Sequence, residues 1–107
     1  NSFITYRGLK MDIKLIKAPS PATLDIIKNR SKFKLEKNPG ALGLVQGKLI
    51  EMTVASDIAY KTSGVEVLDV RGSCPQNMIM LAIIGEMEEV KVALRNIEEK
   101  IKEKDIW

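Results

Sequence analysis

The feature that most constrains the fold is a pair of apolar, β-like runs separated by a short loop. Residues 65–70 read Val-Glu-Val-Leu-Asp-Val, residues 78–84 are apolar throughout, and the loop between them holds Gly72 and Pro75. Glycine and proline favour tight turns, so this segment predicts a β-hairpin with an exposed tip. The tip carries Cys74, the only cysteine of the chain. Because the flanking runs already supply core side chains, this thiol is better placed to meet a ligand or partner than to pack inside.

The composition excludes several classes of protein. The chain has 107 residues, enough for one domain with its own core. It contains no histidine, which removes Ser-His-Asp and Cys-His catalytic sets and the commonest transition-metal ligand. A lone cysteine rules out an internal disulfide framework and indicates a reducing, cytosolic compartment. No run has transmembrane length and no secretory leader is recognised, so we expect no membrane partner.

A basic stretch is the feature that would favour a nucleic-acid ligand. Its cations are Lys28, Arg30, Lys32, Lys34 and Lys37, and Glu36 is its one acidic residue. Such a patch could contact phosphates, but Phe33 is the only aromatic residue within it, and recognition of single strands relies on stacking aromatics. The stretch also follows a predicted helix, whose carboxyl end favours cations. We interpret it as a solvated helix end and loop, and predict no nucleic-acid partner.

Strand and helix patterns alternate along the rest of the chain. Residues 3–7 and 10–15 have strand patterns on either side of Gly8, and residues 41–45 form a short apolar strand. Ser20 as N-cap and Pro21 at the first helical position predict a helix to about Asn29. Further helices are predicted over residues 50–62, with Gly64 as a stop, and from Gly85 onward. The apolar stripes expected on the three helices are, in order, Leu24, Ile26 and Ile27; Ile50, Val54, Ala55, Ile58 and Ala59; and Met87, Val90, Leu94, Ile97 and Ile101.

This order of elements predicts an α+β fold with a single domain. Strands separated by helices and by one hairpin fit a mixed β-sheet flanked by helices. No internal repeat or low-complexity linker divides the chain.

Four segments, taken in order, resemble the bacterial microcompartment shell domain, or BMC domain. They are the strand at residues 41–45, the Ala-x-Asp-x-x-x-Lys pattern at 55–61, the strand at 64–67 and the helix entry at 83–90. In the family's usual order a further strand and helix follow at the C-terminus, whereas here a strand and a helix stand in front. The chain is therefore similar to the circularly permuted shell proteins of ethanolamine and propanediol microcompartments, and above all to the iron–sulfur-binding type associated with glycyl-radical enzymes.

The resemblance implies an organisation and an assembly. The chain would divide into an N-terminal strand extension at residues 1–9 and a permuted shell domain at 10–107. Family members form cyclic hexamers that tile with other shell proteins into the wall of a cytoplasmic organelle, so a homohexamer, shell-protein partners and that location are expected. Lys61 falls where the family carries its tile-edge lysine, although an exposed helix lysine without special role is the alternative. Ala18 and Pro19 replace the family's edge arginine-proline, which favours weaker or heterotypic tiling.

The resemblance also places the hairpin loop at the central pore of the hexamer. Some shell proteins of this superfamily carry an iron–sulfur cluster there, so Cys74 is the expected metal ligand and a 4Fe–4S cluster, shared between subunits, the expected cofactor. An inward-pointing Arg71 would favour the thiolate form. Because a cubane takes four ligands and a ring supplies six thiols, we expect the cluster off-axis on a subset of cysteines. The predicted pore-loop residues are Arg71, Gly72, Ser73, Cys74, Pro75 and Gln76.

Two alternatives stay open. Cys74 could narrow a metal-free pore that passes small molecules, or form disulfides between subunits. The chain could instead be a small α+β ligand-binding regulatory domain, although residues 40–43 match a phosphate-binding glycine loop poorly. Asp57, Glu66 and Asp69 are single carboxylates without an evident partner, so the chain is not predicted to be an enzyme.

Overall fold

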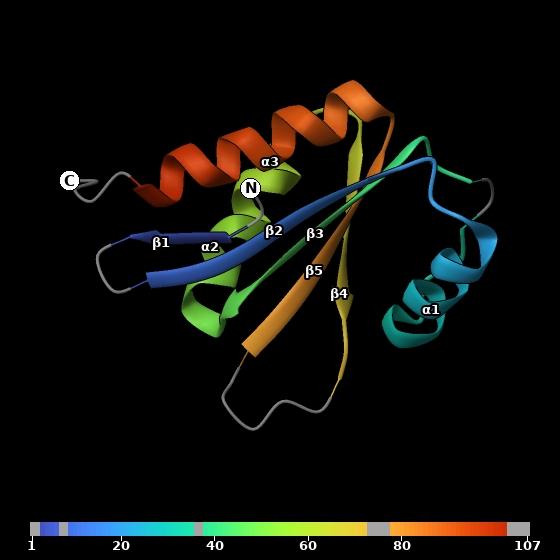
Figure 1. The fold of residues 1–107 in the computed structure, drawn as a ribbon, viewed down its shortest axis with the longest axis horizontal. Coiled ribbons are helices and arrows are strands. Elements are labelled where there is room, and N and C mark those ends of the chain that lie inside the picture. The colour runs from blue at the N-terminus through green and yellow to red at the C-terminus, as the bar shows by residue number, and fades with distance from the viewer. Residues whose placement is uncertain (1–2, 7–8, 36–37, 73–77, 103–107) are drawn as a thin grey trace.

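A computed structural model describes residues 3–6, 9–35, 38–72 and 78–102, with five strands and three helices in that part of the chain. Their order, ββαβαββα, is the predicted one (Figure 1). No helix of the described residues is long and apolar enough to cross a membrane. The elements are β1 (Phe3–Tyr6), β2 (Leu9–Lys17), α1 (Pro21–Ser31), β3 (Ala41–Lys48), α2 (Leu49–Tyr60), β4 (Val65–Val70), β5 (Met78–Gly85) and α3 (Met87–Lys102).

The strands form one sheet in the order β1-β2-β3-β5-β4, and this confirms the α+β class. Every described pairing is antiparallel, so the expectation of a mixed sheet was wrong. The reason lies in the hairpin. Strands β3 and β4 run in the same direction and would pair in parallel if they were neighbours, but β5 lies between them and is antiparallel to both.

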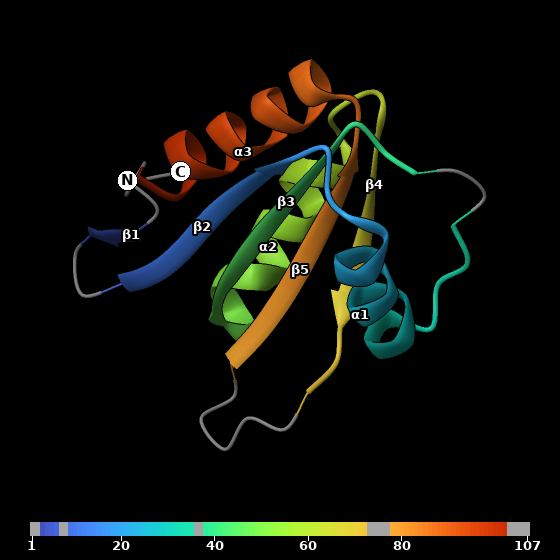
Figure 2. The same cartoon turned by 45° about the vertical axis from the view of Figure 1, so that its right-hand side comes forward.

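Helices cover both faces of the sheet (Figures 1 and 2). On one face α2 and α3 pack over Ala41, Val45 and Ile83. On the other, α1 contributes Ile27 to a smaller cluster that includes Leu42 and Ala82. Successive strand residues point to opposite faces, so β3 and β5, covered on both sides, are apolar at nearly every position.

The helix ends agree with the capping signals, whereas two of the predicted stripes do not agree with the packing. The Ser20 hydroxyl accepts a hydrogen bond from the Thr23 backbone N–H at 3.2 Å, and Pro21 opens α1 as predicted. On α3, Val90, Leu94, Ile97 and Ile101 are buried as predicted, and Met87 is partly buried against the same core. On α1, however, Ile26 is 56% exposed although Leu24 and Ile27 are buried.

The buried face of α2 differs most from the prediction. Ala55 and Ala59 are buried and Ile58 is partly buried, as predicted. Ile50 and Val54, however, are 69% and 46% exposed, and Met52 is buried in their place. The two alanines let the helix lie close against the sheet and α3. In this orientation of the helix, the larger branched side chains of Ile50 and Val54 point outward. Apolar residues would be buried whether Ile50 and Val54 or Met52 faced the sheet. Periodicity alone therefore could not choose between the two orientations of the helix.

Gly85 is required by a close approach of backbone between the start of β4 and the end of β5. A Cβ at Gly85 would lie 2.6 Å from the carbonyl oxygen of Gly64, a residue that itself has a φ of 85°. We therefore expect Gly85→Ala to lower the free energy of unfolding by about 1–3 kcal/mol, the usual cost of overpacking. Chemical denaturation measures this.

Gly40→Ala is the matched control for that experiment. The one short contact of a Cβ at Gly40 would be with the end of the Glu86 side chain, at 2.7 Å from Oε1, and that side chain can move away. Equal stabilities of the Gly85→Ala and Gly40→Ala variants would contradict the close-approach argument.

Candidate functional site

The hairpin predicted around Cys74 is present. Strands β4 and β5 pair from Val65↔Gly85 to Val70↔Met80, and the connection runs through residues 71–77. Arg71 and Gly72, at the start of this connection, are both exposed. The remaining predicted pore-loop residues, Ser73, Cys74, Pro75 and Gln76, lie outside the described residues.

The end of α1 borders the start of the loop. The backbone N–H of Arg71 donates to the carbonyl oxygen of Arg30 at 3.1 Å, and Nη1 of Arg30 donates to the carbonyl oxygen of Arg71 at 3.4 Å. The Arg71 side chain also approaches Asp69, with Nε 4.0 Å from Oδ2. In the sequence, Arg30 belongs to the basic stretch that was predicted to be a solvated helix end and loop. No pattern in the sequence connects it with a residue forty-one positions later.

The start of α2 lies at the same end of the sheet as the loop. Lys48, the last residue of β3, pairs with Met78, the first residue of β5, and α2 begins at the next residue (Figure 2). Three large apolar side chains are exposed on its first two turns and form a surface that we call the apolar α2 face: Leu49, Ile50 and Val54, at 54%, 69% and 46% exposure.

Lys61 lies at the other end of α2, away from the loop. It is the C-cap residue, and its Nζ lies 2.8 Å from Oδ2 of Asp57, with both side chains exposed. Of the residues expected at the facing edge, Ala18 has a φ of 42° and donates its N–H to Gly40, while Pro19 is buried. The exposed face of α2 is therefore apolar near the loop and charged at its far end.

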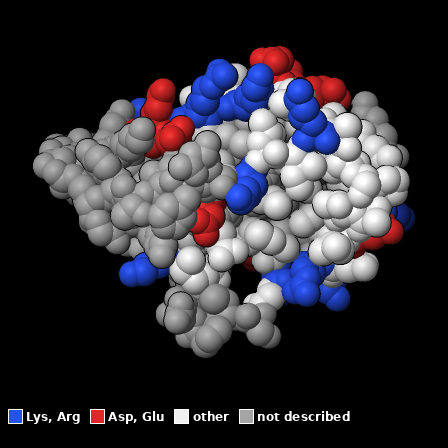
Figure 3. Space-filling view, viewed as in Figure 1, with Lys and Arg blue, Asp and Glu red and all other residues white. Residues whose placement is uncertain are grey.

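The described residues contain no group of three or more His, Cys, Asp or Glu that could hold a metal ion. Cys74, the only cysteine of the sequence, supplies one thiol per chain. Lys and Arg side chains stand in several separate places on the face shown in Figure 3, with Asp and Glu between some of them. On that face the described cations do not form a continuous track of the kind that a nucleic-acid backbone follows.

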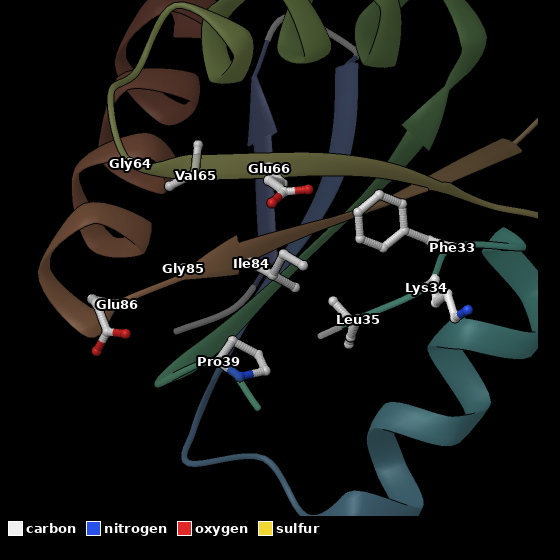
Figure 4. A pocket seen from close by; sticks show the side chains of 10 residues that line it. All are labelled: Phe33, Lys34, Leu35, Pro39, Gly64, Val65, Glu66, Ile84, Gly85 and Glu86. Carbon is white, nitrogen blue, oxygen red and sulfur yellow. The ribbon is translucent and has the colours of Figure 1, made fainter. Parts of the chain in front are cut away.

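A groove lies at the end of the sheet opposite the loop, between the segment after α1 and the β4–β5 pair (Figure 4). It has a volume of about 930 Å³. Phe33 and Leu35 form an apolar wall, while Lys34, Glu66 and Glu86 are spaced around it and do not point at one another. A small-molecule site needs polar groups that converge, so the groove gives little support to the ligand-binding alternative.

Comparisons with known proteins agree with these features. The family profile of the BMC domain matches residues 41–106. The structure of the GrpU microcompartment shell protein from Clostridiales bacterium 1_7_47FAA, solved ligand-free, is similar with 38% identity and a TM-score of 0.70, over 86% of this chain and 93% of that one. Ligand-free GrpU from Pectobacterium wasabiae is similar with 30% identity and a TM-score of 0.66, over 81% and 99%. A search among curated proteins finds no match.

Proposed function

Since this chain belongs to the BMC-domain family of microcompartment shell proteins, we propose that it forms a cyclic homohexamer whose pore-lining loop binds an iron–sulfur cluster through Cys74. The family and its type are those that the sequence predicted, and they make the chain a structural, non-enzymatic component of a bacterial microcompartment shell. The proposal therefore concerns the assembly and the cofactor.

The order of the elements is that of a permuted domain. The family match starts at Ala41, at the beginning of β3. Strand β2, which precedes that match in the sequence, nevertheless lies inside the sheet between β1 and β3. The division into an extension at residues 1–9 and a domain at 10–107 stays a prediction, and so does the role of Lys61 at the tile edge.

The observation that carries the proposed ring is the apolar α2 face. Leu49, Ile50 and Val54 stand exposed on one side of a described helix, beside the end of the sheet that carries the loop. In a ring this face would pack against a different surface of the next copy, and it would bury about the area of three large side chains per subunit. Such contacts would also bring the loop ends of neighbouring sheets together, because the face and the loop share one end of the molecule. An apolar surface of this kind is what a permanent interface uses.

The donor chemistry fits a cluster shared between subunits. Iron–sulfur clusters are held mainly by cysteine thiolates, four for a cubane, and six copies supply six. Arg71 at the start of the loop and Arg30 of α1, which is hydrogen-bonded to it, would offset part of the negative charge of a thiolate-bound cluster. Bound there, such a cluster would supply one-electron redox chemistry to the shell. Four ligands from a six-membered ring require an off-axis cluster and a subset of the cysteines.

Anaerobic purification tests both parts of the proposal. Native mass spectrometry should give a mass of six chains, and iron and acid-labile sulfide should be present at about four of each per hexamer. A monomer or dimer would overturn the ring. A hexamer without iron, sulfide or broad visible absorbance would overturn the cluster and leave the metal-free pore as the function of the loop.

The tile-edge assignment gives a separate prediction. Because Lys61 lies at the far end of α2 from the loop, Lys61→Ala should leave hexamers intact while reducing their assembly into larger sheets. The exposed Asp57–Lys61 pair contributes only about 0.3–0.5 kcal/mol to stability, so folding should be nearly unchanged. Electron microscopy and sedimentation measure the sheets. Lys91→Ala, which removes a lysine paired with Glu88 on α3, is the control. Sheets as extensive as those of the wild type would contradict the assignment.

A further inference from the structure

We propose that Arg30 is a positioning residue for the loop that carries Cys74, acting through two reciprocal hydrogen bonds to Arg71. The inference rests on the proposed function for its purpose, and its geometry stands on described residues alone. It assigns a role to α1, which precedes the segment that the BMC-domain profile matches.

The first bond uses a group that the end of a helix leaves free. Carbonyl groups of the last helical turn have no partner within the helix. Helix α1 ends at Ser31, with Lys32 in the left-handed conformation at a φ of 58°. The carbonyl oxygen of Arg30 accepts the N–H of Arg71 at 3.1 Å, which ties the residue after β4 to the end of the helix.

The second bond is donated by the Arg30 side chain to Arg71, and it brings the guanidinium near Gly72. Nη1 of Arg30 donates to the carbonyl oxygen of Arg71 at 3.4 Å. The same Nη1 lies 3.4 Å from the position that a Cβ on Gly72 would occupy. The guanidinium therefore lies near Gly72 as well as bonded to Arg71.

The helix that makes these bonds is itself anchored. Leu24 and Ile27 of α1 are 2% and 4% exposed, and Ile27 shares its core cluster with Leu68 and Val70 of β4. The end of α1 is therefore held in place by the core that also holds β4. The backbone carbonyl of Arg30 is therefore a fixed acceptor for the Arg71 N–H, and the Arg30 side chain starts from a fixed Cα.

The short segment between Arg71 and Cys74 limits how far the thiol can lie from Arg71. Cys74 comes three residues after Arg71, and three residues span at most about 10 Å. The direction in which the chain leaves Arg71 therefore limits where the thiol can be. Thiols from several subunits must meet within one small cluster, so restricting the start of each loop lowers the entropy cost of assembling the site.

The test is hydrogen–deuterium exchange on the metal-free hexamer, comparing the wild type with Arg30→Ala. Arg30→Ala removes the side-chain bond to the Arg71 carbonyl and keeps the backbone carbonyl that accepts the Arg71 N–H. Without the side-chain bond the start of the loop should open more often, so the amides of Arg71 and Gly72 should exchange about three- to tenfold faster in the variant. Amides within β5 should not change. Arg30→Lys, which keeps a donor, should restore part of the protection. Arg95→Ala removes an exposed arginine from α3 and is the matched control.

A thiol reagent gives a second readout in the same samples. Cys74 should react at a different rate in Arg30→Ala and at the wild-type rate in Arg95→Ala. Unchanged exchange at Arg71 and Gly72 would overturn the positioning role, and so would faster exchange throughout the sheet, which would show a general structural effect. These measurements need no bound iron, so a wild-type protein without iron would overturn the cluster and leave the result on Arg30 standing.

Discussion

Replacing Cys74 with serine is expected to remove essentially all iron and acid-labile sulfide from the anaerobically purified protein. The chain contains no second cysteine and no histidine, and its described residues hold no cluster of carboxylates that could substitute. A serine hydroxyl is a far weaker ligand than a thiolate for an iron–sulfur cluster. The measurements are iron and sulfide content, visible absorbance and electron paramagnetic resonance of the reduced protein.

The control keeps one thiol per chain but moves it. Ser63 is exposed and lies just before β4, at the end of the sheet opposite the loop. The double variant Ser63→Cys, Cys74→Ser should form hexamers and contain no cluster. Iron retained by Cys74→Ser alone would contradict the assignment of the ligand. Iron restored by the double variant would show that any exposed thiol binds the metal and that the loop has no specific role.

The second large effect is expected from Ile50→Asp, which should convert the hexamer to monomers. Ile50 is the most exposed residue of the apolar α2 face, at 69%, so a charge there costs the isolated monomer little. In the ring the same carboxylate would be buried without a partner, which costs several kcal/mol at each interface and raises the dissociation constant about 100-fold or more. Analytical ultracentrifugation and native mass spectrometry measure the change.

Val92→Asp is the matched control, because Val92 is 43% exposed on α3, towards the end of the molecule away from the loop. It should remain hexameric with an unchanged melting temperature. The monomeric Ile50→Asp protein should also contain no iron, since its thiols no longer meet. A hexameric Ile50→Asp protein would show that the ring uses another surface, and a monomeric protein that keeps its iron would contradict the sharing of the cluster between subunits.

The residue types along the chain predicted much of the local structure. Ser20 and Pro21 identify the start of α1, Gly64 follows α2, and the run of residues 78–84 identifies a buried strand. These signals are local, because a cap or a turn involves residues within a few positions of one another. The position of the hairpin loop followed from the same kind of signal.

Local signals could not predict which strand lies beside which, or which side of a helix is buried. Insertion of β5 between β3 and β4 made the sheet antiparallel. The rotation of α2 exposed Ile50, a residue that periodicity had assigned to the core. Both outcomes depend on how several elements share one core volume, and the sequence of a single element does not contain that information.

The sequence by itself determined the order of the elements, the lone thiol on a hairpin and the resemblance to a shell domain, since each depends on residues close together in the chain or on motifs in a fixed order. Only the tertiary structure decided that Arg30 contacts Arg71 and that the apolar α2 face lies at the end of the sheet where β4 ends and β5 begins. Both arrangements involve residues far apart in the sequence. They arise because α1 and α2 pack on opposite faces of one sheet, which brings the end of α1, the end of β4 and the start of α2 to one end of it.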